Sequence, residues 1–216
     1  GLPKEKMMVV VTGMKRMLGL TALCLSLGAF NALAAEKITL MVSGVDKLIY
    51  LPAKLAEQLG YFKETGLDIE LLSEPAGSNA ETEMLAGVAH GVIGFYDHTL
   101  SLQARGKLVQ SVVQFSHAPG EVILASQNAA GGIRTPADFK GRTLGVTGLG
   151  SSTFHLTRYI AFQAGLKSGE YKLLPVGAGA SFISAMAKGD IDAGMTTDRP
   201  APWGTLNRAE SECSIM

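Results

Sequence analysis

The sequence predicts an α/β fold in which parallel strands alternate with short helices. Two observations lead to this prediction: short apolar segments recur along the chain, and most of them are followed by a helical pattern that ends at a glycine. Such an alternation is typical of βαβ units, which place parallel strands in one sheet. At 216 residues, of which 47% are hydrophobic, the chain is long enough to bury a core.

The expected elements fall into two groups, which we predict to be a first lobe over 36–122 and a second lobe over 123–198. The first has strands over 37–43, 68–72, 92–96 and 109–115 and helices over 52–59, 78–87 and 99–104. Ser78 and Glu81 have the spacing of a capping box, so the second of these helices should begin at Ser78. The second group has strands over 122–126, 143–146, 172–176 and 193–196 and helices over 137–139, 151–164 and 182–188.

The two ends of the chain read differently from its body. A basic start at Lys15 and Arg16, an apolar run over 18–30 and small residues before Ala35 predict a cleavable signal peptide over 14–35, and therefore a secreted protein. The run is shorter than the roughly 20 residues that a membrane-spanning helix needs. Residues 1–13 are interpreted as upstream of this signal. Residues 199–216 follow no helical or strand period and are expected to form a disordered tail.

The turn after the strand at 143–146 is the best ligand site in the sequence. Gly148 and Gly150 can adopt φ > 0 and leave no Cβ between the backbone and a ligand. Ser151, Ser152 and Thr153 are residue types that cap helices, and the N–H groups of the first helical turn have no intrahelical partner. Together with the helix dipole, these N–H groups predict an anion site.

Composition and spacing argue against several classes of function. Both cysteines, Cys24 and Cys213, lie outside the body, which excludes a disulfide framework and a thiolate nucleophile there, and the four histidines show no metal-ligand spacing. The formal net charge is zero, so nucleic acid is not an expected partner. The turn has neither the lysine of a P-loop nor the spacing of a hydrolase elbow. We therefore predict no metal, no cofactor and no enzymatic activity.

Four segments carry a resemblance to a known family: LPAKLAEQLGYFKETGLDIEL (51–71), IGFYDHTLSLQARGK (93–107), GRTLGVTGLGSSTFHLTRYIAFQAGL (141–166) and KGDIDAGMTTD (188–198). They resemble the periplasmic substrate-binding proteins of nitrate, sulfonate and taurine ABC transporters, the SsuA/THI5-like and NMT1-like group. The resemblance implies a periplasmic-binding-protein type II fold, with two βαβ lobes around a cleft. It also implies capture of a small anion and its delivery to a membrane permease by a monomer.

Two alternatives to anion transport stay open at this point. Members of this family continue past Asp198, so the fold is expected to be incomplete at the C-terminus, and the chain could be a non-functional or sensor-like fragment. A related pyrimidine-synthesising enzyme shares the fold family, but the cysteine-rich motif that it would call for is absent from this sequence. The corresponding binding alternative is capture of a pyrimidine precursor.

In an open α/β sheet, ligands bind beyond the carboxyl ends of the strands. Asp97 would repel an anion unless it accepts from an amine, such as the ammonium group of taurine, and Lys47 is expected to be a solvated side chain. The residues that this topology places at the expected cleft are Ser43, Gly44, Tyr50, Ser78, Tyr96, Asp97, Gly148, Gly150, Ser151, Ser152, Thr153 and Thr196.

Overall fold

The computed structural model describes residues 36–117, 120–127, 129, 132–197 and 213–215. The predicted signal peptide over 14–35, the residues before it, position 198 and positions 199–212 and 216 of the predicted tail lie outside this part of the chain. No helix within the described ranges has the length and apolar character that crossing a membrane requires.

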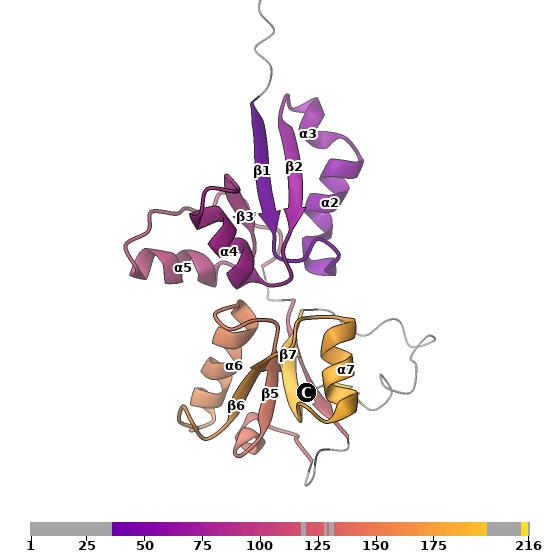
Figure 1. Cartoon of the computed structure of the whole chain (residues 1–216), viewed down its shortest axis with the longest axis vertical. Coiled ribbons are helices and arrows are strands. Elements are labelled where there is room, and N and C mark those ends of the chain that lie inside the picture. The colour runs from indigo at the N-terminus through magenta and orange to yellow at the C-terminus, as the bar shows by residue number, and fades with distance from the viewer. Residues whose placement is uncertain (1–35, 118–119, 128, 130–131, 198–212, 216) are drawn as a thin grey trace, which may run out of the picture. The chain divides into compact units, whose positions relative to one another are not determined.

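The first sheet is parallel throughout and has the strand order β2-β1-β3. Its strands are β1 (Lys37–Val42), β2 (Asp68–Ser73) and β3 (Gly91–Ile93). The accompanying helices are η1 (Leu48–Tyr50), α2 (Leu51–Gln58), α3 (Tyr61–Glu64), α4 (Gly77–Leu85) and α5 (Asp97–Ala104). Figure 1 shows α2 and α3 on one side of this sheet and α4 on the other.

The second sheet has the strand order β6-β5-β7-β4-β8. Its strands are β4 (Val122–Ser126), β5 (Thr143–Val146), β6 (Lys172–Pro175), β7 (Ala193–Thr196) and β8 (Cys213–Ile215). Strand β5 is parallel to β6 and β7, whereas β4 is antiparallel to β7 and β8. The helical elements are η2 (Pro136–Phe139), α6 (Ser152–Gln163) and α7 (Ala180–Lys188).

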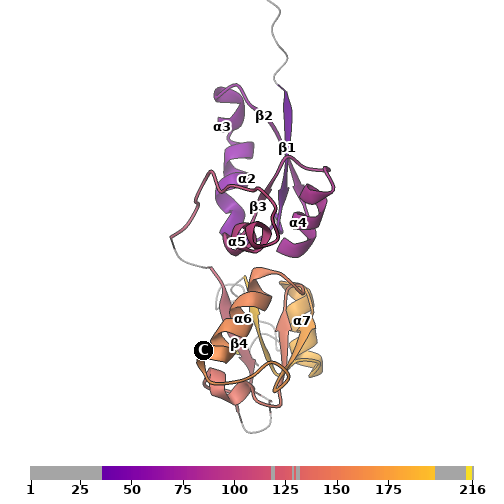
Figure 2. The same ribbon diagram turned by 90° about the vertical axis from the view of Figure 1, so that its left-hand side faces the viewer.

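The second sheet is covered by apolar side chains on both faces. Leu124 of β4 packs in a cluster with Phe182 of α7, whereas the next residue, Ala125, packs with Ala161 of α6 and Phe139 of η2. Successive residues of a strand point to opposite faces, so α6 and α7 cover different sides of the sheet, as Figures 1 and 2 show. These two layers hold the strand ends at which the candidate site lies.

Three expected elements differ from the structure. The strand predicted over 109–115 is absent: Val112 and Val113 are exposed by 85% and 68%, because no neighbouring strand pairs with this segment among the described residues. The strand predicted over 92–96 ends at Ile93, and α5 already begins at Asp97. In the predicted tail, 213–215 form β8, which pairs with β4 through backbone hydrogen bonds although the sequence of the tail has no strand period.

Candidate functional site

The turn between β5 and α6 is built on three hydroxyl groups that bond to one another. The Oγ1 atoms of Thr147 and Thr153 lie 2.9 Å apart, and Ser151 Oγ lies 2.8 Å from Thr153 Oγ1 and 3.1 Å from Thr147 Oγ1. The backbone N–H of Thr147 also donates to Thr153 Oγ1 at 3.0 Å. All three side chains are buried, so the hydroxyls of Ser151 and Thr153 hold the turn together instead of facing a ligand.

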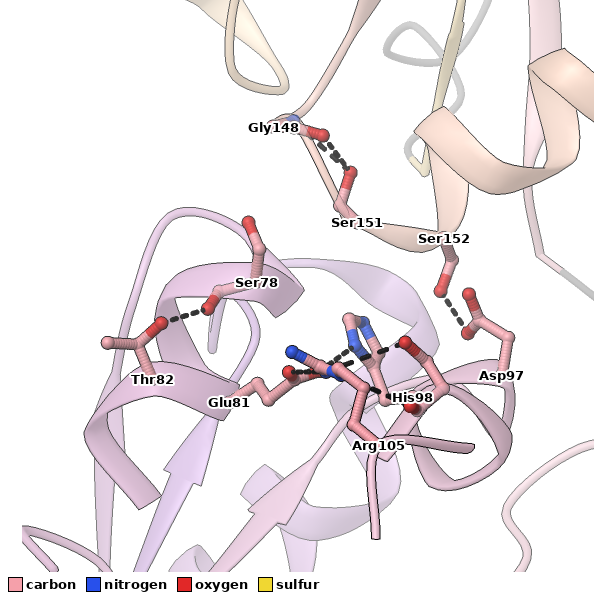
Figure 3. A network of polar contacts seen from close by, with 10 residues as sticks. Ser78, Glu81, Thr82, Asp97, His98, Arg105, Gly148, Ser151 and Ser152 are labelled. Carbon is pink, nitrogen blue, oxygen red and sulfur yellow. Dashed lines mark hydrogen bonds and ion pairs between the residues drawn. The ribbon is translucent and has the colours of Figure 1, made fainter. Parts of the chain in front are cut away.

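Ser151 is the residue before α6, but its side chain does not cap the helix. Its hydroxyl donates to the carbonyl of Gly148 at 2.6 Å and accepts from the Gly148 N–H at 3.2 Å, as Figure 3 shows. The prediction that the hydroxyls cap this helix is therefore wrong for Ser151. The first-turn N–H groups receive no side-chain cap from it, so the anion-binding capacity of the turn rests on the backbone.

The two glycines of the turn serve different purposes. Gly148 is buried, and a Cβ there would lie 2.9 Å from Ala76 Cβ and 3.1 Å from Ser78 Oγ, so the turn approaches the start of α4 closely. Gly150 has φ +81°, which L side chains rarely adopt, but the nearest atom to a Cβ there, Ser78 Cβ, would be 3.8 Å away. The constraint at Gly150 is thus conformational rather than steric.

Gly150→Ala is expected to lower the free energy of unfolding by about 1 kcal/mol, because the left-handed backbone conformation is unfavourable for a residue with a Cβ atom. Urea denaturation measures this loss. Gly87→Ala is the matched control: Gly87 has φ +82° with no atom within 4 Å of a Cβ, so an equal loss is expected. A loss at Gly150 that greatly exceeds the loss at Gly87 would contradict the conformational explanation.

Helix α4 begins one residue earlier than predicted, and the capping box is wrong. Ala76 precedes the helix without a side-chain cap, and the Ser78 carbonyl accepts from Thr82 Oγ1 at 2.9 Å within the helix. Glu81 turns away from the helix start toward α5, where it accepts from Arg105 and pairs with His98 Nδ1 at 2.9 Å. Hydrogen bonds to the Arg105 guanidinium group and the His98 ring stabilise the Glu81 carboxylate more than the single backbone N–H of a capping box would.

Asp97 connects the start of α5 to the start of α6. Its Oδ1 accepts a hydrogen bond from Ser152 Oγ, whereas its Oδ2 is shielded from solvent and has no hydrogen-bond partner within the described residues. The neighbouring Tyr96, expected at the cleft, lies beyond the end of β3 at Ile93 and is 61% exposed. Of this predicted pair, only Asp97 offers a buried polar atom that a ligand could satisfy.

Glu121, which the sequence did not single out, is the most strongly perturbed group of the site. Both carboxyl oxygens are buried and lack a hydrogen-bond partner in the described part of the chain. Burial raises the pKa of Glu121 to about 8, and the charge of Asp97 acts in the same direction, against the opposing charge of Lys47. Val122 pairs with Thr196, so the antiparallel register of β4 and β7 brings Glu121 to the carboxyl end of β7.

Lys47 is 7% exposed, which corrects the prediction of a solvated side chain. Its Nζ donates to the carbonyl of Ser43 at 2.6 Å and to the carbonyl of Pro75 at 3.0 Å. Gly44 has φ +107°, and a Cβ there would lie 2.7 Å from Lys47 Cδ, so this glycine makes room for the lysine stem. Lys47 therefore contributes a buried positive charge beside the strand end of β1.

Three hydroxyl groups at strand ends complete the candidate site. Ser43 follows β1, Thr196 ends β7 and Thr197 follows it; they are 2%, 2% and 6% exposed, and none of their hydroxyls has a hydrogen-bond partner within the described residues. Because a buried polar group without a partner is costly, these groups and the free oxygens of Asp97 and Glu121 point to a ligand that would satisfy them.

The structure buries most of the predicted site residues and exposes one. Those that are buried are Ser43, Tyr50, Gly148, Ser151, Ser152, Thr153 and Thr196, and those that are half-buried are Gly44, Ser78, Asp97 and Gly150; Tyr96 is exposed. The contacts above connect the turn at 148–152 with Ser78 and Asp97. Within the described ranges, no group of three or more histidine, cysteine, aspartate or glutamate side chains could hold a metal ion.

An open depression lies beside α6 and β6, apart from the candidate site. Its lining residues are Phe154, Arg158, Ser168, Gly169, Tyr171 and Leu173. None of them is a predicted site residue, and the buried unpartnered atoms lie on other residues. The depression therefore has no part in the candidate site.

Comparison with known protein families and structures supports this assignment of fold. The family model described as NMT1/THI5 like matches residues 50–213. A solved structure of a protein from Bordetella bronchiseptica RB50 is 34% identical, with a TM-score of 0.74 over 83% of this chain and 56% of that chain. The alkanesulfonate-binding protein SsuA from Xanthomonas axonopodis pv. citri, bound to MOPS, is 24% identical, with a TM-score of 0.60 over 85% of this chain and 61% of that chain. The predicted periplasmic-binding-protein fold is confirmed.

Curated relatives correct one prediction. The 4-amino-5-hydroxymethyl-2-methylpyrimidine phosphate synthase of Saccharomyces cerevisiae is 30% identical over 166 residues, which are 76% of this chain and 46% of the relative. The chain spans about half the length of the curated relatives that it matches. Their name is that of an enzyme, and it contradicts the prediction that the chain is not one, which rested on the absence of catalytic motifs.

Proposed function

Because the chain belongs to the NMT1/THI5-like family and has the fold of ABC-type solute-binding proteins, we propose that it captures a small ligand carrying an aminopyrimidine ring. The observation that carries the proposal is Glu121, whose two carboxyl oxygens are both buried and unpartnered. The relatives' name supports it, since it contains an aminopyrimidine phosphate.

The protonation state of Glu121 suits one edge of such a ring. With a pKa of about 8, the carboxyl group is mostly protonated at neutral pH and has one O–H donor and one carbonyl acceptor. A 4-aminopyrimidine presents a ring nitrogen that accepts and an adjacent amino group that donates. The two hydrogen bonds would satisfy both oxygens of Glu121 at once, which a ligand without a donor beside an acceptor would not do.

The remaining groups of the site suit the rest of such a ligand. The unpartnered Oδ2 of Asp97 can accept from an amino group, and the hydroxyls of Ser43, Thr196 and Thr197 can donate or accept. An anionic substituent, such as a phosphate, would bind the N–H groups at the start of α6. This division explains how a site with two carboxyl groups would still bind an anion, as the sequence predicts.

The amino sulfonate taurine is the second ligand candidate, because its ammonium group would meet Asp97 and its sulfonate the turn. Nitrate and simple alkanesulfonates lack a donor and would leave Oδ2 of Asp97 and the carbonyl oxygen of Glu121 without a hydrogen bond. The structure thus favours ligands that carry both a nitrogen donor and an anionic group over the simple anions.

We propose periplasmic capture and delivery to an ABC permease as the physiological role, since several structural neighbours are ligand-binding components of ABC import systems. The synthase activity named for the curated relatives is the second candidate, in which the same site would hold an aminopyrimidine as product. Formation of a pyrimidine phosphate beyond the amount that co-purifies with the chain, measured by mass spectrometry, distinguishes this role from capture alone.

Isothermal titration calorimetry of the 216-residue chain tests the proposed ligand. We expect 4-amino-5-hydroxymethyl-2-methylpyrimidine phosphate to bind, nitrate to give no heat, and Asp97→Asn to weaken binding by about tenfold through loss of one charged acceptor. Asp68→Asn, at an exposed position of β2, is the control and should bind like the wild type. No heat with any aminopyrimidine or with taurine would refute the proposal and favour a fragment that binds nothing.

A further inference from the structure

We propose that Glu81 and His98 are positioning residues that fix the direction of the Asp97 carboxylate. Glu81 of α4 is buried, and both of its carboxyl oxygens bond to residues of α5 and its end. His98 is 7% exposed and directly follows Asp97 in the chain. Neither residue is among those whose free polar atoms face a ligand, so the inference concerns how the proposed ligand site is held and rests on the proposed function.

Glu81 fastens α5 to α4 at two points. Its Oε2 lies 2.9 Å from Nδ1 of His98, in the first turn of α5, and its Oε1 accepts from Nη2 of Arg105, the residue after the helix. Arg105 also donates from Nε to the carbonyl of Ser101 at 3.1 Å, which keeps the guanidinium group alongside the helix. Figure 3 shows this network between the two helices. A helix held near its beginning and at its end cannot rotate freely about its axis.

The other ring nitrogen of His98 lies against the first residue of α4. A Cβ on Gly77 would overlap His98 Nε2 and lie 3.1 Å from Cε1, so only a glycine lets the ring approach this closely. Gly77 is flanked by Ala76 and Ser78, which are the neighbours that a Cβ on Gly148 would meet. The same ring therefore touches the α4 start that faces the anion turn.

These contacts place the network one residue away from the site on two sides. His98 directly follows Asp97, which accepts a hydrogen bond from Ser152. Gly77, which the ring of His98 approaches, directly precedes Ser78. Because both carboxyl oxygens of buried Glu81 have a partner, replacing the carboxylate with an amide would leave Arg105 and His98 with a single neutral acceptor oxygen in place of two charged ones. We infer that α5 would then shift and carry Asp97 away from both Ser152 and the ligand.

A double-mutant cycle with the 4-amino-5-hydroxymethyl-2-methylpyrimidine phosphate probe tests the inference by calorimetry. Glu81→Gln is expected to weaken binding by about tenfold in the wild type but less than about twofold in the Asp97→Asn background, because its effect passes through Asp97. His98→Asn, whose amide nitrogen replaces Nδ1, should bind better than His98→Ala. Glu57→Gln, which removes the Lys54 ion pair on α2, is the control and should change nothing.

A merely structural role predicts a different result. If Glu81→Gln weakens binding equally in both backgrounds, or if His98→Asn binds no better than His98→Ala, Glu81 and His98 do not act through Asp97. If the wild type binds no aminopyrimidine, the proposed function fails and the inference is judged without a ligand. The Tm loss caused by Ser152→Ala should then shrink in the Glu81→Gln background, and strictly additive Tm losses would overturn the inference.

Discussion

The free energy of unfolding is expected to fall by about 4 kcal/mol between pH 5 and pH 9 because of Glu121 alone. The carboxyl group has an ordinary pKa of 4.5, which burial and Asp97 raise to about 8 in the folded chain. Between these values the carboxyl group is ionised in the unfolded chain and protonated in the folded chain, so the free energy of unfolding decreases as pH rises. The stabilising contribution of Glu121 is gone once the pH has passed about 8. A pKa unit corresponds to about 1.4 kcal/mol, so the rise from 4.5 to about 8 is worth about 5 kcal/mol, of which about 4 kcal/mol is lost between pH 5 and pH 9.

Urea denaturation of the wild type and of Glu121→Gln at both pH values measures this contribution, since glutamine has no proton to release. The wild type should lose about 4 kcal/mol more than the variant between pH 5 and pH 9. Glu83→Gln, at a half-buried position of α4, is the control and should behave like the wild type. Equal pH dependence in the wild type and Glu121→Gln would show that Glu121 is not buried as described.

Gly194→Ala is expected to lower the free energy of unfolding by about 3 kcal/mol or more, a large fraction of the stability of a typical domain. Gly194 of β7 pairs with Gly145 of β5, and a Cβ at Gly194 would overlap the carbonyl oxygen of Gly145 and lie 2.7 Å from its nitrogen. These are backbone atoms of a central strand pair, so relief requires the two strands to separate.

Gly91→Ala in β3 provides the matched control for this strand glycine. Its Cβ would meet only Leu40 Cδ2, at 3.2 Å, and a side-chain methyl group can shift. We expect a change of less than about 1 kcal/mol by denaturation monitored with circular dichroism. A Gly194→Ala variant as stable as Gly91→Ala would contradict the close packing of β5 against β7.

The sequence predicted those parts of the fold that local patterns determine. The bounds of β4, β5 and β7 agree with the expected ranges, because short apolar segments between turn residues are typical of buried strands. The segment over 109–115 has the same apolar character, yet Val112 and Val113 are exposed. A strand exists only where a neighbour supplies hydrogen bonds, and a local pattern carries no information on neighbours.

The candidate site was predictable where it depends on strand ends and not where it depends on tertiary contacts. Ser43, Asp97 and Thr196 follow from the topology of a parallel sheet. Glu81 fits a capping box locally, but its partners His98 and Arg105 come from another helix. Glu121 was missed, although it is the only acidic residue between Asp97 and Asp138 and directly precedes a buried apolar strand, which is a usable signal.

The pH dependence of aminopyrimidine binding tests the central claim most directly, because it depends on the proton that Glu121 shares with the ring. Calorimetry with neutral 4-amino-5-hydroxymethyl-2-methylpyrimidine should show an affinity that falls as pH rises above about 8, where Glu121 ionises and loses its donor, and Glu121→Gln should remove this fall. An affinity that rises through pH 8, or that Glu121→Gln leaves unchanged at every pH, would contradict it.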